Sequence, residues 1–230
     1  MNPSPMHRPR RRLVELAGPA GVGKSTVSRA LSQRRAAAHG TIWGQPVLPL
    51  LGNGVQLLPT LVGFWLDSGS LLWDESRHMV RLRTLHQSLR QPQSLATETV
   101  LLFDEGPIFA LAWLRGFGHE SMRRKVSERW WRATLEQWAR KVDTVVVLDA
   151  SDSLLAHRIR TRPEWHEVKQ ASDRDISVWM ARFRTALNWV LAGLMVNGGP
   201  VVVRIPADQD QPERIAEQVM AALDGVSYDN

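Results

Sequence analysis

The chain has 230 residues, enough for one sizeable α/β domain, and 43% of them are hydrophobic, which is ordinary for a packed globular core. It contains no cysteine, which excludes disulfides, thiolate metal sites and thiol nucleophiles and suits a cytoplasmic protein. Its 29 Lys and Arg residues outweigh 23 Asp and Glu residues and give a formal net charge of +6.

Part of the positive charge lies at the start of the chain, in MNPSPMHRPRRR. This stretch has arginines and prolines but no apolar run, so it does not resemble a secretory signal. We expect residues 1–12 to form a flexible basic tail. A short run of charge is usually solvated, and nucleic acid is therefore not an expected partner.

The first predicted elements are a strand, a loop and a helix. The apolar run RLVELAG, residues 12–18, predicts a buried strand. A helical pattern follows from Lys24 to His39, and Gly40 is its expected end.

The chain then has no Asp, Glu, Lys or Arg from Gly40 to Leu66, a length that would span a bilayer. Three prolines and several glycines interrupt this stretch, and a helix in lipid must satisfy its own backbone. We therefore expect turns and short helices packed inside the domain, and no stable membrane insertion. An apolar or membrane-derived substrate is the alternative.

Helices and strands alternate in the rest of the chain. Helices are predicted at residues 74–90, 122–142 and 172–194, the last behind a Ser172–Asp175 capping box, and from Asp210 onwards. Strands are predicted at TETVLLFDEG, KVDTVVVLDAS and GGPVVVRIPA, each too continuously apolar for a sheet with one wet face. This alternation predicts βαβ units and a mostly parallel sheet.

A complete P-loop motif, GPAGVGKST, lies between the first predicted strand and helix. Glycines at this spacing let backbone N–H groups surround phosphate oxygens, and the helix N-terminus adds its dipole. Lys24 would bridge the β- and γ-phosphates of ATP, and Ser25 would bind Mg²⁺. The predicted nucleotide-binding residues are Gly18, Pro19, Ala20, Gly21, Val22, Gly23, Lys24, Ser25 and Thr26.

The second predicted strand, VLLFDE, ends on two adjacent carboxylates, Asp104 and Glu105. Such a pair could hold Mg²⁺ and activate water, as in an ATPase motor, or position the hydroxyl of a small-molecule acceptor. The chain has no N-K-x-D guanine motif and no L-S-G-G-Q-like signature, which argues against a GTPase and an ABC-type ATPase. This motif alone is also compatible with an AAA-type ATPase or a helicase.

After the third predicted strand, the sequence VVVLDASDSLLAHRIRTRPEWHEVKQASDRD contains Arg158, Arg160 and Arg162. This order resembles the lid of the nucleoside and nucleoside-monophosphate kinases, particularly the thymidylate-kinase-like group. The resemblance implies a P-loop NTPase three-layer α/β/α sandwich with a mostly parallel sheet and a small helical lid at about residues 158–174. It implies one such domain over residues 13–230, with the three arginines closing over the γ-phosphate to stabilise its charge and exclude water.

The chain departs from that family at the acidic strand end. Thymidylate kinases follow the strand Asp with Arg, and deoxynucleoside kinases use Glu followed by Arg. Here Asp104 is followed by Glu105 and Gly106, so the arginine that would orient the substrate is missing. We therefore do not expect this chain to use the family's usual acceptor.

Other residues could replace that arginine. Arg77 and Arg81 lie one turn apart on the predicted 74–90 helix and could reach an anionic acceptor, although an exposed amphipathic helix explains the same pattern. Trp65 and Trp73 could line an acceptor pocket or belong to the core.

The sequence thus predicts an enzyme, an ATP-dependent phosphotransferase with a small hydroxylated or phosphorylated acceptor, first a nucleoside or nucleoside monophosphate and then a sugar or antibiotic. Ser25 and Asp104 would organise Mg²⁺, and Asp104 or Glu105 would accept the proton, with Asp104 the stronger candidate. The rivals are an ATPase or nucleotide-dependent switch, in which Glu105 activates water, and a catalytically idle nucleotide-binding protein. The acceptor's identity and a homodimer are left open.

Overall fold

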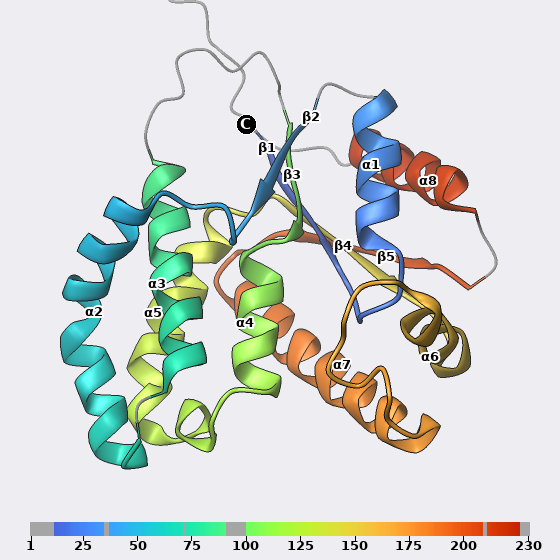
Figure 1. The fold of residues 1–230 in the computed structure, drawn as a ribbon. Helices are drawn as coiled ribbons and strands as arrows, with labels where there is room; N and C mark the ends of the chain where they lie inside the picture. Colours follow the sequence, from blue (N-terminus) through green and yellow to red (C-terminus); the bar gives the residue numbers. More distant parts are fainter. Residues whose placement is uncertain (1–11, 35–36, 71, 91–99, 209–210, 226–230) are drawn as a thin grey trace, which may run out of the picture.

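The computed structural model describes residues 12–34, 37–70, 72–90, 100–208 and 211–225. At its centre is a parallel sheet of five strands in the order β2-β3-β1-β4-β5 (Figure 1). The strands are β1 (Arg12–Ala17), β2 (Ala37–Thr41), β3 (Val100–Glu105), β4 (Thr144–Asp149) and β5 (Val201–Pro206). Because all five run the same way, their carboxyl ends meet at one edge of the sheet.

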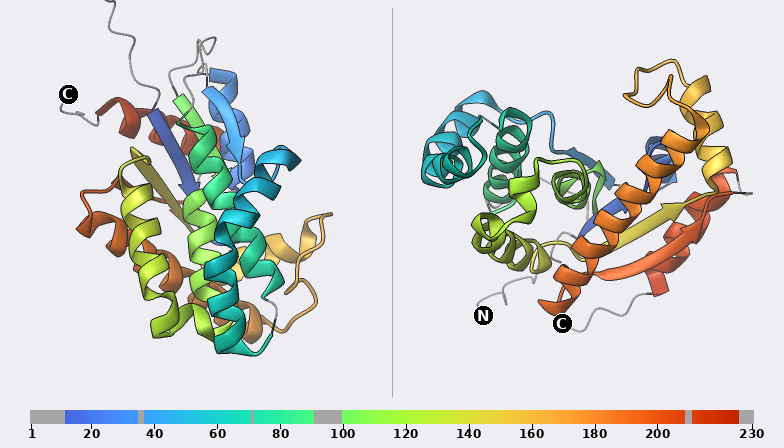
Figure 2. Two further views of the ribbon diagram at one scale, coloured as in Figure 1. Left: turned by 90° about the vertical axis from the view of Figure 1, so that its left-hand side faces the viewer. Right: turned by 90° about the horizontal axis from the view of Figure 1, so that it is seen from below.

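Helices cover both faces of the sheet and make a three-layer α/β/α sandwich (Figures 1 and 2). One face packs against α1 (Lys24–Arg34), α6 (Asp152–Thr161) and α8 (Pro212–Gly225). The other packs against α3 (Trp73–Ser88), α4 (Pro107–Gly116), α5 (Lys125–Ala139) and the longer part of α7 (Asp173–Val196). A short 3₁₀ helix, η1 (Glu120–Arg123), precedes α5.

The sheet buries two hydrophobic cores, one on each face. Along β1, Val14 and Leu16 belong to the core under α1 and α8, and Leu13 and Ala17 to the core under α4 and α7. Successive side chains of a strand point to opposite faces, which explains why the central strands are apolar at nearly every position. The expectation of full burial is wrong for β5, an edge strand whose Val201 is 42% exposed.

The segment after the P-loop helix differs from its prediction. The helix expected to reach His39 ends at Arg34, and residues 37–41 form β2, which pairs with β3. A side chain at Gly40 would place its Cβ 2.4 Å from the Phe103 ring, so the glycine fits the strand instead of ending a helix. Pairing with β3 thus overrides the local helical pattern.

The uncharged stretch also differs from its prediction. Instead of turns and short helices inside the domain, it forms one helix, α2 (Val47–Ser68), which includes Pro59 and lies on the outside of the molecule (Figure 2). Leu57 and Phe64 are buried on its inner side, where the Asn53 side chain donates hydrogen bonds to Thr84 Oγ1 (3.2 Å) and Gln87 Oε1 (2.8 Å) of α3. This packing offsets the cost of the internal proline.

The remaining predicted helices are confirmed with shifted ends. Residues 74–90 correspond to α3, and Ser172 of the predicted capping box is the N-cap of α7: its Oγ accepts a hydrogen bond from the Asp175 N–H at 3.2 Å and donates to Asp175 Oδ2 at 2.7 Å. Asp210, the predicted start of the last helix, lies outside the described residues. Among the described helices, α2 meets the length and composition of a membrane-spanning segment.

Candidate active site

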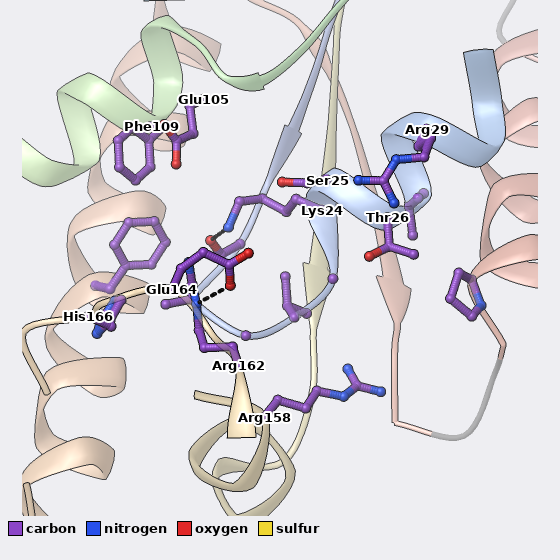
Figure 3. Close-up of a pocket in the computed structure, with 18 of the residues that line it drawn as sticks. Lys24, Ser25, Thr26, Arg29, Glu105, Phe109, Arg158, Arg162, Glu164 and His166 are labelled. Carbon is purple, nitrogen blue, oxygen red and sulfur yellow. Dashed lines mark hydrogen bonds and ion pairs between the residues drawn. The ribbon is translucent and has the colours of Figure 1, made fainter. Parts of the chain in front are cut away.

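The P-loop turn joins the carboxyl end of β1 to α1 (Figure 3). Its backbone conformation depends on glycine at two places. A Cβ at Gly18 would lie 2.2 Å from the Leu148 carbonyl oxygen of β4, and Gly23 has φ +95°, in the left-handed region that side chains disfavour. Lys24 follows directly, and its Nζ donates to the carbonyl oxygens of Gly18 (2.8 Å) and Pro19 (3.1 Å).

The Lys24 ammonium group lies close to the two carboxylates at the end of β3. Burial lowers the pKa of Lys24 from its ordinary value to about 8, and the negative charges of Glu105 and Asp104 partly oppose this shift. An anion such as a phosphate beside Nζ would favour the charged form further. The site therefore presents a desolvated cation where a P-loop protein binds phosphate.

The two carboxylates of β3 occupy different positions. Glu105 lines the cavity in front of the P-loop, and Asp104 does not (Figure 3). Strand alternation places Asp104 on the same face as Leu102, which belongs to the core beneath α1, and Glu105 on the same face as Phe103, in the core beneath α4. Asp104 thus points to the side of the helix that carries Ser25, and Glu105 to the side of α4.

Glu105 is oriented by aromatic residues behind it. The Trp43 indole Nε1 donates to Glu105 Oε2 at 2.5 Å, and the Arg81 guanidinium carbon lies 4.4 Å above the centre of the Trp43 ring. The His78 ring meets Trp43 edge-on at 5.4 Å and stacks on Trp113 at 4.3 Å. Arg81 therefore contacts the ring of the residue that bonds to Glu105, and it does not line the cavity.

A second glutamate, Glu15 of β1, holds the backbone that follows Glu105. Its side chain is fully buried and accepts hydrogen bonds from the N–H groups of Gly106 (3.2 Å), Ile108 (2.9 Å) and Phe109 (2.8 Å). It thereby satisfies donors at the start of α4 that the helix itself leaves unpaired. Burial raises the pKa of Glu15 to about 8, against the lowering effect of these three hydrogen bonds.

The predicted lid arginines separate into two groups. Arg158 and Arg162 line the cavity, and Arg162 also lies 3.4 Å from Glu164 (Figure 3). Arg160 is not among the cavity residues: it forms an ion pair with Asp173 at 2.5 Å and donates to the Ala171 carbonyl oxygen at 3.0 Å. Arg160 therefore ties the end of α6 to the start of α7.

Aromatic rings form the wall of the cavity opposite the P-loop. Phe109 and Trp113 come from α4, and Trp179 and Phe183 from α7. Trp179 and Phe183 lie parallel, with ring centres 6.0 Å apart, and the Trp179 Nε1 donates to Glu167 Oε1 at 2.6 Å. Phe183 is buried, and Phe117 already stacks on Trp179 with ring centres 4.7 Å apart, so this wall is an apolar surface of rings packed on one another.

The cavity enclosed by these elements has a volume of about 1010 Å³ and is completed by Gln211, Pro212 and Ile215 at the start of α8. It is large enough for a nucleotide and a second small molecule. No group of three or more His, Asp or Glu side chains with the arrangement of a metal site occurs within the part of the chain that the structure describes. A Mg²⁺ ion bound mainly by phosphate and water needs no such group, and the Ser25 hydroxyl beside Lys24 suits it as a ligand.

The structure thus brings together the P-loop, Glu105, Arg158 and Arg162, and leaves other candidates outside. Trp65 and Trp73 are 51% and 65% exposed and do not line the cavity. Arg77 is exposed and forms an ion pair with Asp74 at 3.4 Å.

Sequence reasoning missed several residues of the site. These are Glu15, Trp43, Phe109, Trp113, Trp179 and Phe183. The aromatic residues on α4 and α7 have the helical spacing of core positions, so only their place in the fold reveals them. The sequence does indicate a special role for Glu15, because a carboxylate in the middle of a buried apolar strand needs hydrogen-bond donors.

No family model and no curated protein matches the chain by sequence. Solved structures of deoxyadenosine kinase from M. mycoides are similar in fold. One, with dCMP and dCDP bound, has a TM-score of 0.56 at 14% identity and covers 93% of this chain and 100% of that chain. Another, with dATP bound, has a TM-score of 0.52 at 15% identity over the same shares of the two chains. The chain therefore has the three-layer fold of P-loop kinases.

Proposed function

We propose that this protein is an ATP-dependent small-molecule kinase that transfers the γ-phosphate of ATP to a hydroxyl group. The observation that carries the proposal is that the P-loop with Lys24, the Glu105 carboxylate, and Arg158 with Arg162 all line one cavity. Phosphoryl transfer needs groups in these roles: a phosphate cradle, a base for the acceptor and cations for the developing charge.

ATP would lie with its phosphates on the P-loop N–H groups and on Lys24, after Lys24 exchanges its bonds to the Gly18 and Pro19 carbonyl oxygens for the phosphates. The Ser25 hydroxyl and Asp104 would hold Mg²⁺, which supplies charge neutralisation of the phosphate oxygens. Asp104 fits this role because strand alternation directs it to the face of α1. Gln211 and Pro212 line the cavity near α8 and would lie beside the adenine ring of ATP.

Glu105 would accept the proton of the acceptor hydroxyl. In the reaction the acceptor oxygen forms a bond to the γ-phosphorus, the bond from that phosphorus to the β–γ bridging oxygen breaks, and ADP leaves. The hydrogen bond from Trp43 keeps one carboxylate oxygen of Glu105 fixed, and the other is free to face the acceptor. This assignment reverses the preference for Asp104 that the sequence suggested.

Arg158 and Arg162 would stabilise the charge of the transferring group, and residues 158–174 would form the lid. The segment between α6 and α7 contributes Glu164, Trp165, His166 and Glu167 to the cavity wall, as a closing lid requires. Arg160 would then support the lid by its ion pair with Asp173.

The aromatic wall favours an uncharged acceptor that contains a ring. The α4 and α7 residues that line the cavity are Phe109, Trp113, Trp179 and Phe183, and none of them carries a charge. A phosphorylated acceptor would need a cation on that side. We therefore prefer a nucleoside to a nucleoside monophosphate, an acceptor unlike that of the thymidylate-kinase-like group whose order of motifs the chain resembles.

The test is to incubate the protein with ATP, Mg²⁺ and single acceptors from a panel of nucleosides, nucleoside monophosphates, sugars and aminoglycosides. ADP and phosphorylated product should appear in equal amounts with at least one acceptor. Lys24→Ala should abolish most of this turnover and leave the circular dichroism spectrum unchanged. If ADP and free phosphate appear at the same rate with and without every acceptor, the protein is an ATPase, with Glu105 activating water.

A further inference from the structure

The outward side of α2 exposes a continuous row of large apolar side chains. The row, here named the α2 stripe, follows three- and four-residue helical spacing, and its members are between 46% and 81% exposed. In the left view of Figure 2, α2 lies in front of α3 and α5 with no other described helix over it. The α2 stripe consists of Val47, Leu48, Leu51, Val55, Leu58, Val62, Trp65 and Leu66.

The exposed area of the α2 stripe is large. The eight residues adjoin one another at exposures between 46% and 81%, so together they form one apolar patch on the order of several hundred Å². A typical monomer has a largest apolar patch of about 300–600 Å². Each partner in a stable protein complex buries about 800 Å², so the α2 stripe is large enough to form the apolar centre of such an interface.

Contacts on the inner side of α2 fix which side of the helix faces outwards. Asn53 bonds to Thr84 and Gln87 of α3, its Oδ1 accepts a hydrogen bond from Arg83 at 3.0 Å, and Leu57 is buried. Rotating α2 to bury the stripe would break these bonds and expose Leu57. No rotation of α2 that keeps these contacts therefore buries the stripe against the described part of the fold.

The chemistry of the surface fits a second copy of this chain better than a lipid surface. Helices that lie on membranes carry Lys and Arg beside their apolar face, whereas α2 has no basic residue anywhere along its length. A two-fold contact brings the same surface of both copies together, so an uncharged stripe meets no like charge. Asp67, the acidic residue of α2, is already paired with Arg124 at 3.5 Å.

We propose that the α2 stripe is a homodimer interface, in which α2 of one copy packs against α2 of a second copy across a two-fold axis. None of its eight residues lines the P-loop cavity, so the dimer leaves both cavities open. The proposal does not depend on the reaction that the protein catalyses.

The first test is the mass in solution, measured by light scattering and sedimentation over a range of concentrations. The wild-type chain should have twice the 26.0 kDa mass of one copy. The double variant Leu51→Lys and Val55→Lys should be monomeric at the same concentrations, because two-fold symmetry would place its charges close together. Val196→Lys, at an 87% exposed position at the end of α7, is the matched control and should stay dimeric.

A second test uses the absence of cysteine from the chain. Single cysteines at Leu51, Val55, Leu58 and Val62 should form disulfide-linked dimers on mild oxidation, with one position near the two-fold axis far more efficient than the rest. Val196→Cys should not cross-link. Equal cross-linking at all five positions would show random collision and would overturn the proposal.

Two further outcomes would also overturn it. One is a monomeric wild-type chain that stays monomeric at its highest soluble concentration. The other is a monomer that floats with phosphatidylserine vesicles and loses this binding in the double lysine variant, which would assign the α2 stripe to a membrane surface instead.

Discussion

Asp104 and Glu105 are neighbours in the sequence, but the alternation of β3 turns them to different faces of the sheet. Their chemical environments differ accordingly. Glu105 receives the Trp43 indole N–H and lines the cavity, whereas Asp104 lies on the face covered by α1. The two neighbouring carboxylates are therefore expected to have separate roles.

We expect Glu105→Gln to lower kcat by roughly 100-fold or more, the usual loss when a general base is removed, with ATP affinity changed little. Asp104→Asn should chiefly raise the Mg²⁺ concentration needed for half-maximal rate. Steady-state kinetics over a Mg²⁺ titration, with ATP binding measured separately, distinguishes the two. A larger loss of kcat in Asp104→Asn at saturating Mg²⁺ would exchange the assignments.

Glu15 acts on the site from beneath it, through the backbone. Its bonds to the N–H groups of Gly106, Ile108 and Phe109 fix the turn between Glu105 and α4. A Cβ at Gly106 would lie 2.6 Å from Glu15 Oε2, so this contact also explains the glycine that follows the acidic pair. The carboxylate is therefore a structural partner of the site.

The raised pKa of Glu15 predicts a specific dependence of stability on pH. The pKa is about 8 in the folded protein and 4.5 in a model carboxyl group, so between these values the folded state binds more protons than the unfolded state. Stability from this group is complete below pH 4.5 and is lost as the pH rises through 8, by up to about 1.4 kcal/mol per pH unit.

We expect the free energy of unfolding of the wild-type protein to fall relative to that of Glu15→Gln between pH 5 and 8, and to run parallel above pH 8. Urea unfolding at each pH measures this difference. Glu213→Gln, an exposed carboxylate on α8, serves as the matched control. Parallel curves for all three proteins over the whole range would mean that Glu15 is ionised in the fold at every pH tested.

At the scale of elements, the end of α6 and the residue that follows it direct three arginines to two different places. Arg158 and Arg162 lie one turn apart on the cavity side, and Arg160, between them, faces Asp173. Arg158 and Arg160 belong to α6, where residues two apart lie on different sides of the helix, and Arg162 is the cap residue just beyond it, with an extended backbone (φ −64°, ψ 143°).

Arg162→Ala is expected to lower kcat by roughly 100-fold with a much smaller change in ATP affinity, because its partner charge is greatest in the transition state. Arg160→Ala is the matched comparison and should retain most of kcat, with a modest loss of thermal stability from the broken ion pair with Asp173. A larger loss of kcat in Arg160→Ala than in Arg162→Ala would place Arg160 at the phosphate instead.

The element that departs most from its prediction is α2. Its prolines and glycines indicate turns, yet contacts of Asn53, Leu57 and Phe64 with the rest of the fold keep it helical. Prolines and glycines in the local sequence show that a helix is intrinsically unfavourable in this segment. Packing against the rest of the fold offsets that cost. The same packing leaves the α2 stripe exposed, a property that periodicity alone could not distinguish from burial.

At the scale of the whole molecule, the strand order decides what meets at the site. Because β1 lies between β3 and β4, the P-loop that follows β1 has Glu105 on one side and Arg158 and Arg162 on the other. Helices α4 and α7 then close the cavity with aromatic rings contributed by segments about 70 residues apart in the chain. No local pattern contains that juxtaposition.

The sequence by itself determined the P-loop, four of the five described strands of the parallel sheet and their alternation with helices, because glycine spacing, strand apolarity and helical periodicity are local properties. The tertiary structure alone decided that Glu105 lines the cavity in place of Asp104, that Arg160 lies outside it, and that aromatic residues with core-like spacing form its wall. It also decided that residues 37–41 join the sheet as β2. These outcomes depend on which faces of distant elements meet, and burial and pairing across the fold outweigh the local preferences of each segment.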